Sequence, residues 1–75
     1  MPRLPRMSAP DLLKALKRDG WNEIGQAGSH VQLKHPTKVG KVTLGVHTSK
    51  TIPPRILASI LKQANLTAEE LRRLL

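Results

Sequence analysis

Three histidines in the middle of the chain are the first candidates for chemistry. They are His30, His35 and His47, and the first two lie in the stretch AGSHVQLKHP. An imidazole changes its protonation close to neutral pH, so histidine can take up or release a proton during a reaction. A lone histidine is more often a packed or solvent-exposed residue without such a role. The elements that position these three side chains therefore decide whether they act together.

The same part of the chain is strongly basic. The chain has 13 Lys and Arg against 5 Asp and Glu, a formal net charge of +8, and no acidic residue lies between Glu23 and Glu69. A positive field of this kind favours a polyanionic partner, and nucleic acid explains it better than a merely solvated basic surface. We expect no membrane binding, because no predicted helix pairs a broad basic face with exposed aromatic residues.

Length and composition limit the architecture to one small unit. The 75 residues are near the lower end of what folds on a hydrophobic core alone, and the chain contains no cysteine. Disulfide frameworks and thiolate metal sites are therefore excluded. No segment has the apolar length of a signal peptide core or a membrane span, so we expect a cytoplasmic protein with residues 1–75 as a single domain.

The first part of the chain predicts an arm and a helix. Residues 1–7 contain two prolines and no periodicity, so they are expected to form an extended arm before the domain proper at residues 8–75. Ser8 is typical of a helix N-cap, with Asp11 three residues later, and Gly20 is expected to end this helix.

Alternation of apolar and polar residues then predicts three strands between Trp21 and His47. In the first strand Ile24 is expected to point inward, and the chain turns between Gly25 and Ser29. Each of the next two strands has one apolar and one basic, polar face, since side chains alternate across a strand. The predicted inward residues of these two strands are Val31, Leu33, Val42, Leu44 and Val46, and His35 shares their side.

Two further helices complete the predicted fold. Pro53 and Pro54 fit the first turn of a helix, which continues to about Asn65. A short last helix begins at Thr67 with Glu70 in the position of a capping box. The predicted apolar stripe of the longer helix consists of Ile56, Leu57, Ile60, Leu61 and Ala64. We expect an α+β two-layer sandwich, in which two helices cover one face of a three-stranded antiparallel sheet and the other face stays in solvent.

The strand pairing places two of the histidines on the open face. To match the apolar faces, the sum of paired residue numbers must be odd, and 77 and 75 both suit the loop. In the first register His30 faces His47, and in the second they are diagonal neighbours across Gly45. His35 has the opposite parity and points toward the helices or the loop. A site with three histidine ligands is therefore disfavoured, and we expect no bound metal.

The open face suits phosphodiester chemistry on RNA. His30 and His47 share it with Lys34 and Lys41, and Lys50 follows in the next loop. Cleavage by attack of the 2′-hydroxyl needs a base, a proton donor for the leaving oxygen and cations around the phosphorus. From these residues alone, a sheet that binds RNA or protein without catalysis explains the pattern equally well.

Trp21 is the only aromatic residue of the chain, so the stacking platforms of single-strand binders are missing. We expect Trp21 to pack at the junction of the first helix and the first strand. Recognition by shape and phosphate charge, as in double-stranded-RNA-binding domains, requires no aromatic residues.

Four stretches taken in order resemble the HicA family of toxin ribonucleases from bacterial type II toxin–antitoxin systems. These are LLKALKRDGW, GSHVQLKHP, HTSK and ILKQANLTAEELRRLL, which together span nearly the whole chain. The resemblance implies a double-stranded-RNA-binding-domain-like fold and an endoribonuclease that cleaves mRNA. It also implies a HicB-type antitoxin as protein partner, and no cofactor.

The resemblance further implies roles for single residues. His30 corresponds to the catalytic histidine of a Gly-Ser-His turn, which Gly28 and Ser29 shape, and His47 is the candidate second catalytic histidine. Gly45 stands where the family often has proline, and this departure concerns the surroundings of His47. The residues expected to hold RNA phosphates are Lys34, Lys41 and Lys50.

Overall fold

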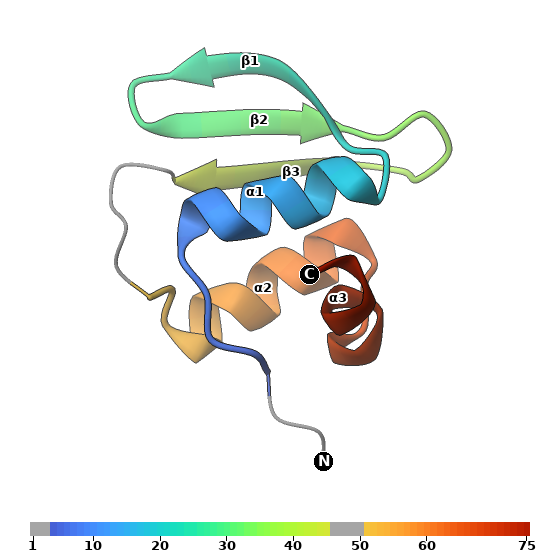
Figure 1. Cartoon of the computed structure of the whole chain (residues 1–75). Coiled ribbons are helices and arrows are strands. Elements are labelled where there is room, and N and C mark those ends of the chain that lie inside the picture. The colour runs from blue at the N-terminus through green and yellow to red at the C-terminus, as the bar shows by residue number, and fades with distance from the viewer. Residues whose placement is uncertain (1–3, 46–50) are drawn as a thin grey trace.

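The computed structural model describes residues 4–45 and 51–75 of the chain (Figure 1). Three strands form one antiparallel sheet in the order β1-β2-β3, and the predicted α+β class is confirmed. The elements in chain order are α1 (Ala9–Arg18), β1 (Asn22–Ala27), β2 (His30–Lys34), β3 (Lys41–Gly45), α2 (Pro54–Ala64) and α3 (Ala68–Leu74).

The helices begin and end at the residues that the sequence indicated. In α1 the Ser8 hydroxyl accepts a hydrogen bond from the Asp11 amide at 3.4 Å. In α3 the Glu70 amide donates to the Thr67 hydroxyl at 3.1 Å, and the Thr67 amide donates to the Glu70 carboxylate at 2.9 Å. This reciprocal pair is a capping box, which satisfies two amides that the helix itself leaves without partners. α2 ends at Asn65 in the left-handed conformation, with φ 53°.

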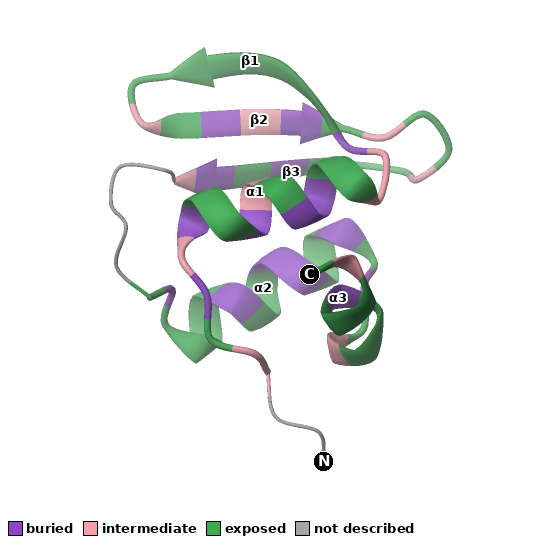
Figure 2. Cartoon of the chain, viewed as in Figure 1, coloured by how far each residue is buried: buried purple, intermediate pink, exposed green. Residues whose placement is uncertain are grey.

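One hydrophobic core lies between the sheet and the helices. Figure 2 shows buried positions alternating with more exposed ones along β2 and β3. α1 and α2 pack against β3, while α3 packs against α1. Trp21 is only 1% exposed, which confirms its predicted packing role. The other fully buried large side chains are Leu12, Leu16, Leu33, Val42, Leu44, Leu57 and Leu71.

The prediction that Ile24 points into the core is wrong. Its side chain is 51% exposed, and all six residues of β1 are exposed. The pairing of β1 with β2 shifts between Glu23 and Gly25, where a bulge interrupts the alternation of side chains. The helices contact β3 and the core includes residues of β2 and β3, so β1 forms an edge strand outside the covered area.

The assignment of Ile56 to the core stripe of α2 is also wrong. Ile56 is 52% exposed, whereas Leu57, Ile60, Leu61 and Ala64 are buried. The buried residues follow the spacing i, i+3, i+4 and i+7 of one helix face. Ile56 lies one residue before this face, at the border of the core rather than inside it.

The pairing of β2 with β3 selects one of the two expected registers. Leu33 lies opposite Val42, and His30 lies opposite Gly45, so paired residue numbers sum to 75. His47, the inward position expected for Val46 and the end of the predicted third strand lie outside the described residues.

A polar cluster around Asp19 lies at the end of the sheet that is remote from His30 and links it to the helices. The Asp19 carboxylate accepts hydrogen bonds from Lys38 Nζ at 2.7 Å and from Trp21 Nε1 at 3.2 Å. Lys38 Nζ also donates to the carbonyl of Ala64 at 3.2 Å. The cluster therefore joins α1, the β2–β3 loop and the end of α2.

His35 belongs to this cluster and has a structural role. Its Nδ1 accepts the amides of Thr37 and Lys38, each at 3.1 Å, so the ring proton must be on Nε2, which donates to the Asp19 carbonyl at 2.7 Å. The ring also meets Trp21 edge to face, with centroids 5.3 Å apart. As predicted from its parity, His35 points away from the open face.

Candidate functional site

The outward face of β2 and β3 is polar and basic. Strand pairing places six residues on it, and none of the six is acidic. Lys34 and Lys41 are exposed, as is His30 at the other end of β2. The six residues are His30, Gln32 and Lys34 from β2 and Lys41, Thr43 and Gly45 from β3.

A two-residue turn positions His30 as the first residue of β2. Ala27 pairs with His30, and only Gly28 and Ser29 lie between them. Gly28 has φ 59° whereas Ser29 has a negative φ, which are the signs of a type II′ hairpin turn. The Gln26 side chain donates a hydrogen bond to the Gly28 carbonyl at 3.0 Å. Gly28 and Ser29 therefore form the turn that leads directly into His30.

The His30 imidazole is available to a ligand. It is exposed, and within the described parts of the chain neither ring nitrogen makes a hydrogen bond. Both nitrogens of His35, by contrast, are occupied by the protein. Of these two histidines, only His30 has ring nitrogens that are not already bonded within the described parts of the chain.

Lys34 and Lys41 lie directly opposite each other across the β2–β3 pair. Lys34 lies four positions after His30 in β2, which corresponds to about 13 Å along the face. Like charges in directly opposed positions destabilise a sheet, so this pair favours an anion between or above the two ammonium groups. The structure thus brings two predicted lysines together, at the far end of the face from His30. Lys50 lies outside the described residues.

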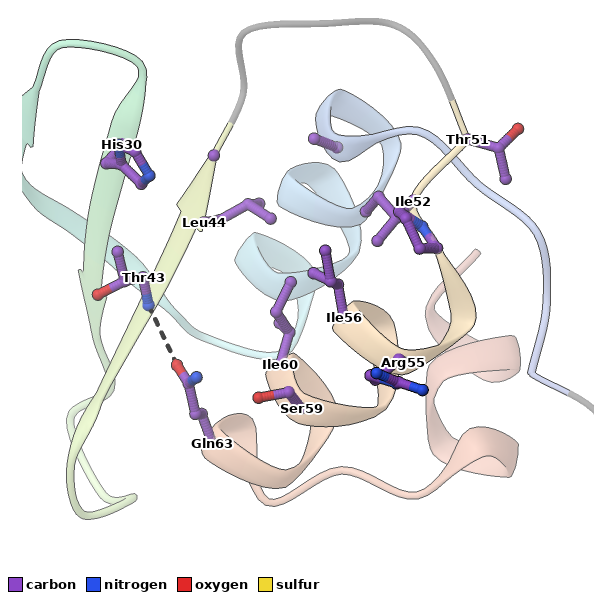
Figure 3. Close-up of a pocket in the computed structure, with 13 residues that line it drawn as sticks. His30, Thr43, Leu44, Thr51, Ile52, Arg55, Ile56, Ser59, Ile60 and Gln63 are labelled. Carbon is purple, nitrogen blue, oxygen red and sulfur yellow. Dashed lines mark hydrogen bonds between the residues drawn. The ribbon is translucent and has the colours of Figure 1, made fainter.

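A groove with a volume of about 500 Å³ begins beside His30 and runs between β3 and α2 (Figure 3). β3 is the edge strand on this side of the sheet, and α2 forms the opposite wall. The residues that line it are Ala9, His30, Thr43, Leu44, Gly45, Thr51, Ile52, Pro53, Arg55, Ile56, Ser59, Ile60 and Gln63.

The contribution of α2 to this site was not predicted from the sequence. One face of α2 lines the groove, because its residues follow the spacing i, i+3, i+4 and i+7, and Arg55 adjoins this face; the residues are Ile56, Ser59, Ile60 and Gln63. In the sequence this face is a mixed polar and apolar stripe next to the core stripe. Ile56 widens the core stripe by one residue, so apolar periodicity alone does not separate the two.

Gln63 connects this stripe of α2 to the edge of the sheet. The Thr43 amide points away from β2 and donates a hydrogen bond to Gln63 Oε1 at 3.3 Å, drawn as a dashed line in Figure 3. An edge amide that would otherwise face solvent or a ligand is thus satisfied by a side chain.

The described residues contain no cluster of three or more His, Cys, Asp or Glu side chains that could hold a metal ion. In the same residues, no helix is long and apolar enough to cross a membrane.

The fold and the site define a class of small α+β proteins with helices on one face of a three-stranded sheet and an open basic surface on the other. A comparison with protein-family models matches residues 9–66 to the family described as HicA toxin of bacterial toxin-antitoxin. The match covers most of the chain, and the protein belongs to the HicA toxin family. It is therefore the toxin of a bacterial toxin–antitoxin system, and the resemblance noted in the sequence is confirmed. The comparison with curated proteins found no match.

Proposed function

We propose that this toxin is an endoribonuclease that cleaves mRNA without a metal ion, with His30 as general acid or general base. The observation that carries the proposal is the exposed His30 imidazole, held by a tight turn at one end of a basic face. A proton-transfer group must be free of internal partners and accessible to substrate, and His30 meets both conditions.

The proposed reaction is an internal phosphoryl transfer. A base removes the proton of the ribose 2′-hydroxyl, the 2′-oxygen attacks phosphorus, and the bond from phosphorus to the 5′-oxygen breaks. An acid protonates the departing 5′-oxygen, so the products carry a 2′,3′-cyclic phosphate and a 5′-hydroxyl. Imidazole can serve in either step near neutral pH. His30 performs one of them, and His47 is the proposed partner for the other.

Cations of the face are proposed to hold the RNA backbone. Lys34 and Lys41 lie opposite each other at the end of the outward face that is remote from His30. They would therefore contact phosphates of the RNA chain that are some distance from the phosphate that reacts. Lys50 is proposed as a further phosphate contact. Because every nucleotide carries the same phosphate, such contacts need no base-specific geometry.

We further propose that the neutralising partner is a HicB-type antitoxin and that both act in the cytoplasm. A protein that covers His30 or the lysine pair would exclude RNA from the same surface. Complementary negative charge on the antitoxin would match the basic face and speed association.

The test is an incubation of purified protein with a defined RNA in the presence of EDTA, followed by mapping of the fragment ends. Wild type is expected to cut and to leave cyclic phosphate ends. His30→Ala and His30→Gln are expected to lose about 100-fold or more of the rate, the lower range for one proton-transfer group. Lys62→Ala, on an exposed position of α2 outside the groove, is the control and should cut normally.

Circular dichroism of each variant shows whether folding is preserved. If the folded His30 variants cut as wild type does, the role of His30 is wrong. If wild type and all variants bind RNA but none of them, wild type included, cuts it, the protein is an RNA-binding module of the same fold, and the proposal of catalysis fails.

A further inference from the structure

The groove between β3 and α2 combines apolar walls with a polar rim. Ile56 and Ile60 of α2 and Leu44 of β3 form the apolar part, and Arg55 and Gln63 contribute polar atoms (Figure 3). Its volume of about 500 Å³ lies within the range of small-molecule sites. A flat, partly apolar molecule with hydrogen-bonding edges suits such a lining better than a bare anion does.

The Gln63 side chain has a defined orientation in this groove. Its Oε1 accepts the Thr43 amide, and an N–H donor can only face the oxygen of the carboxamide. The Nε2 group with its two protons is therefore left to donate to a ligand. Arg55 adds further donors, because a guanidinium carries five N–H groups and no acceptor.

Charge and position connect the groove to the proposed reaction. His30 and Arg55 line the groove, and among the described residues that line it none is acidic. The His30 imidazole lies at the rim of the groove. When a phosphodiester is bound at His30, a nucleotide next to that phosphodiester therefore lies at the opening of the groove. His30 belongs both to the outward face and to the lining of the groove, so RNA bound on that face meets the groove at His30.

Resting on the proposed function, we infer that the groove binds the nucleobase of a nucleotide adjacent to the cleaved phosphodiester and so sets the sequence preference. The aliphatic walls replace the aromatic platforms that the chain lacks. Gln63 donates to an acceptor atom on the edge of the base. A site that hydrogen-bonds its ligand discriminates strongly against ligands that cannot form the bond, because its polar groups are then left unpaired.

Gln63→Glu is the sharpest substitution for this inference. A carboxylate oxygen still accepts the Thr43 amide, so the contact of α2 with β3 is preserved, while both donor protons are removed. Ile56→Ala tests the apolar wall with little risk to folding, because Ile56 is half exposed. Ala58→Glu adds the same negative charge on an exposed position of α2 that does not line the groove, and it serves as the matched control.

The experiment maps cut sites in an RNA with a randomised segment and compares base frequencies on both sides of the cut. Wild type and Ala58→Glu are expected to share one preference. Gln63→Glu is expected to change it by about 10-fold, the upper range for loss of one hydrogen bond. Ile56→Ala is expected to weaken the same preference.

A uniform fall in rate with unchanged base frequencies in the Gln63 and Ile56 variants would overturn the inference and leave the proposed function intact. If those variants instead lose affinity for the antitoxin with unchanged base frequencies, the groove is a protein-docking site and the inference is likewise wrong. If wild type does not cut, the proposed function fails. In that case RNAs are selected for binding to the His30→Ala protein and to the same protein with Gln63→Glu added, and the enriched bases are compared. A different enrichment supports the inference, and equal enrichment contradicts it.

Discussion

At the level of single residues, His30 and His35 show how strand position gives one residue type two different environments. Side chains five positions apart on a regular strand have opposite parity and point to opposite faces. His30 is exposed on the open face, while His35 lies against Trp21 and Asp19 with both nitrogens engaged. We therefore expect replacement of His35 by alanine to change the stability of the protein more than replacement of His30 by alanine.

We expect His35→Ala to destabilise the protein by about 2–3 kcal/mol, because it leaves two loop amides unpaired and opens a space beside Trp21. His30→Ala should change the free energy of unfolding by less than about 0.5 kcal/mol, as for an exposed residue without partners. Urea unfolding of both variants, followed by Trp21 fluorescence, measures the difference. Equal destabilisation by the two substitutions would contradict the structural role of His35.

At the scale of elements, α2 presents two stripes to different surroundings. Leu57, Leu61 and Ala64 face the core, and Ile56 and Gln63 face the groove, with Ile60 in both. Sequence periodicity identified the helix and its buried side correctly. It did not separate the stripes, because an isoleucine one residue before the core face widens an apolar stripe without changing its period.

The capping box of α3 predicts a pH dependence of stability. Hydrogen bonds from the Thr67 amide, and then from the Thr67 hydroxyl, lower the pKa of Glu70 below its ordinary value, and Lys38 adds to this effect. The folded pKa is thus below the unfolded one. The stabilisation is present at pH values above the unfolded pKa and is lost as pH falls through the folded pKa.

We therefore expect Glu70→Gln to lower the melting temperature at about pH 7, and the difference from wild type to shrink toward about pH 3 as Glu70 becomes protonated. Thermal unfolding at several pH values measures this. Glu69→Gln removes a carboxylate of the same turn that is outside the capping box, and it is the control. A difference that is constant with pH would show that the carboxylate charge is not what stabilises the cap.

At the scale of the whole molecule, the two faces of the sheet have separate tasks. The core between the sheet and the helices, together with the Asp19 cluster, stabilises the fold, and the outward face of β2 and β3 carries the exposed His30, Lys34 and Lys41. Lys38 illustrates the division: it belongs to the basic interval of the sequence but forms an ion pair with Asp19 at 2.7 Å. The charge available to a ligand is therefore smaller than the sequence count implies.

If Lys34 and Lys41 each neutralise one RNA phosphate, removing both should weaken RNA binding uniformly across sequences. The plot of log affinity against log salt concentration has a negative slope, and each phosphate contact on single-stranded RNA contributes about 0.7 to its magnitude. Loss of two contacts should therefore reduce the magnitude of the slope by about 1.4. Titrations of the His30→Ala protein, with and without the two lysine substitutions, measure the slope without cleavage. An unchanged slope would mean that RNA does not contact this end of the face.

Local patterns in the sequence specify the helices, their caps, the alternating faces of β2 and β3 and the separation of His35 from His30, because the helix and strand repeats set these relations. The family is indicated by four stretches spread along the chain. The register, the exposure of Ile24 and the groove beside His30 follow instead from tertiary contacts. The bulge in β1 interrupts the two-residue repeat, and the groove depends on a contact between Thr43 and Gln63, which are twenty residues apart in the chain. Such contacts follow from how α2 packs on the edge of the sheet, which no local pattern specifies.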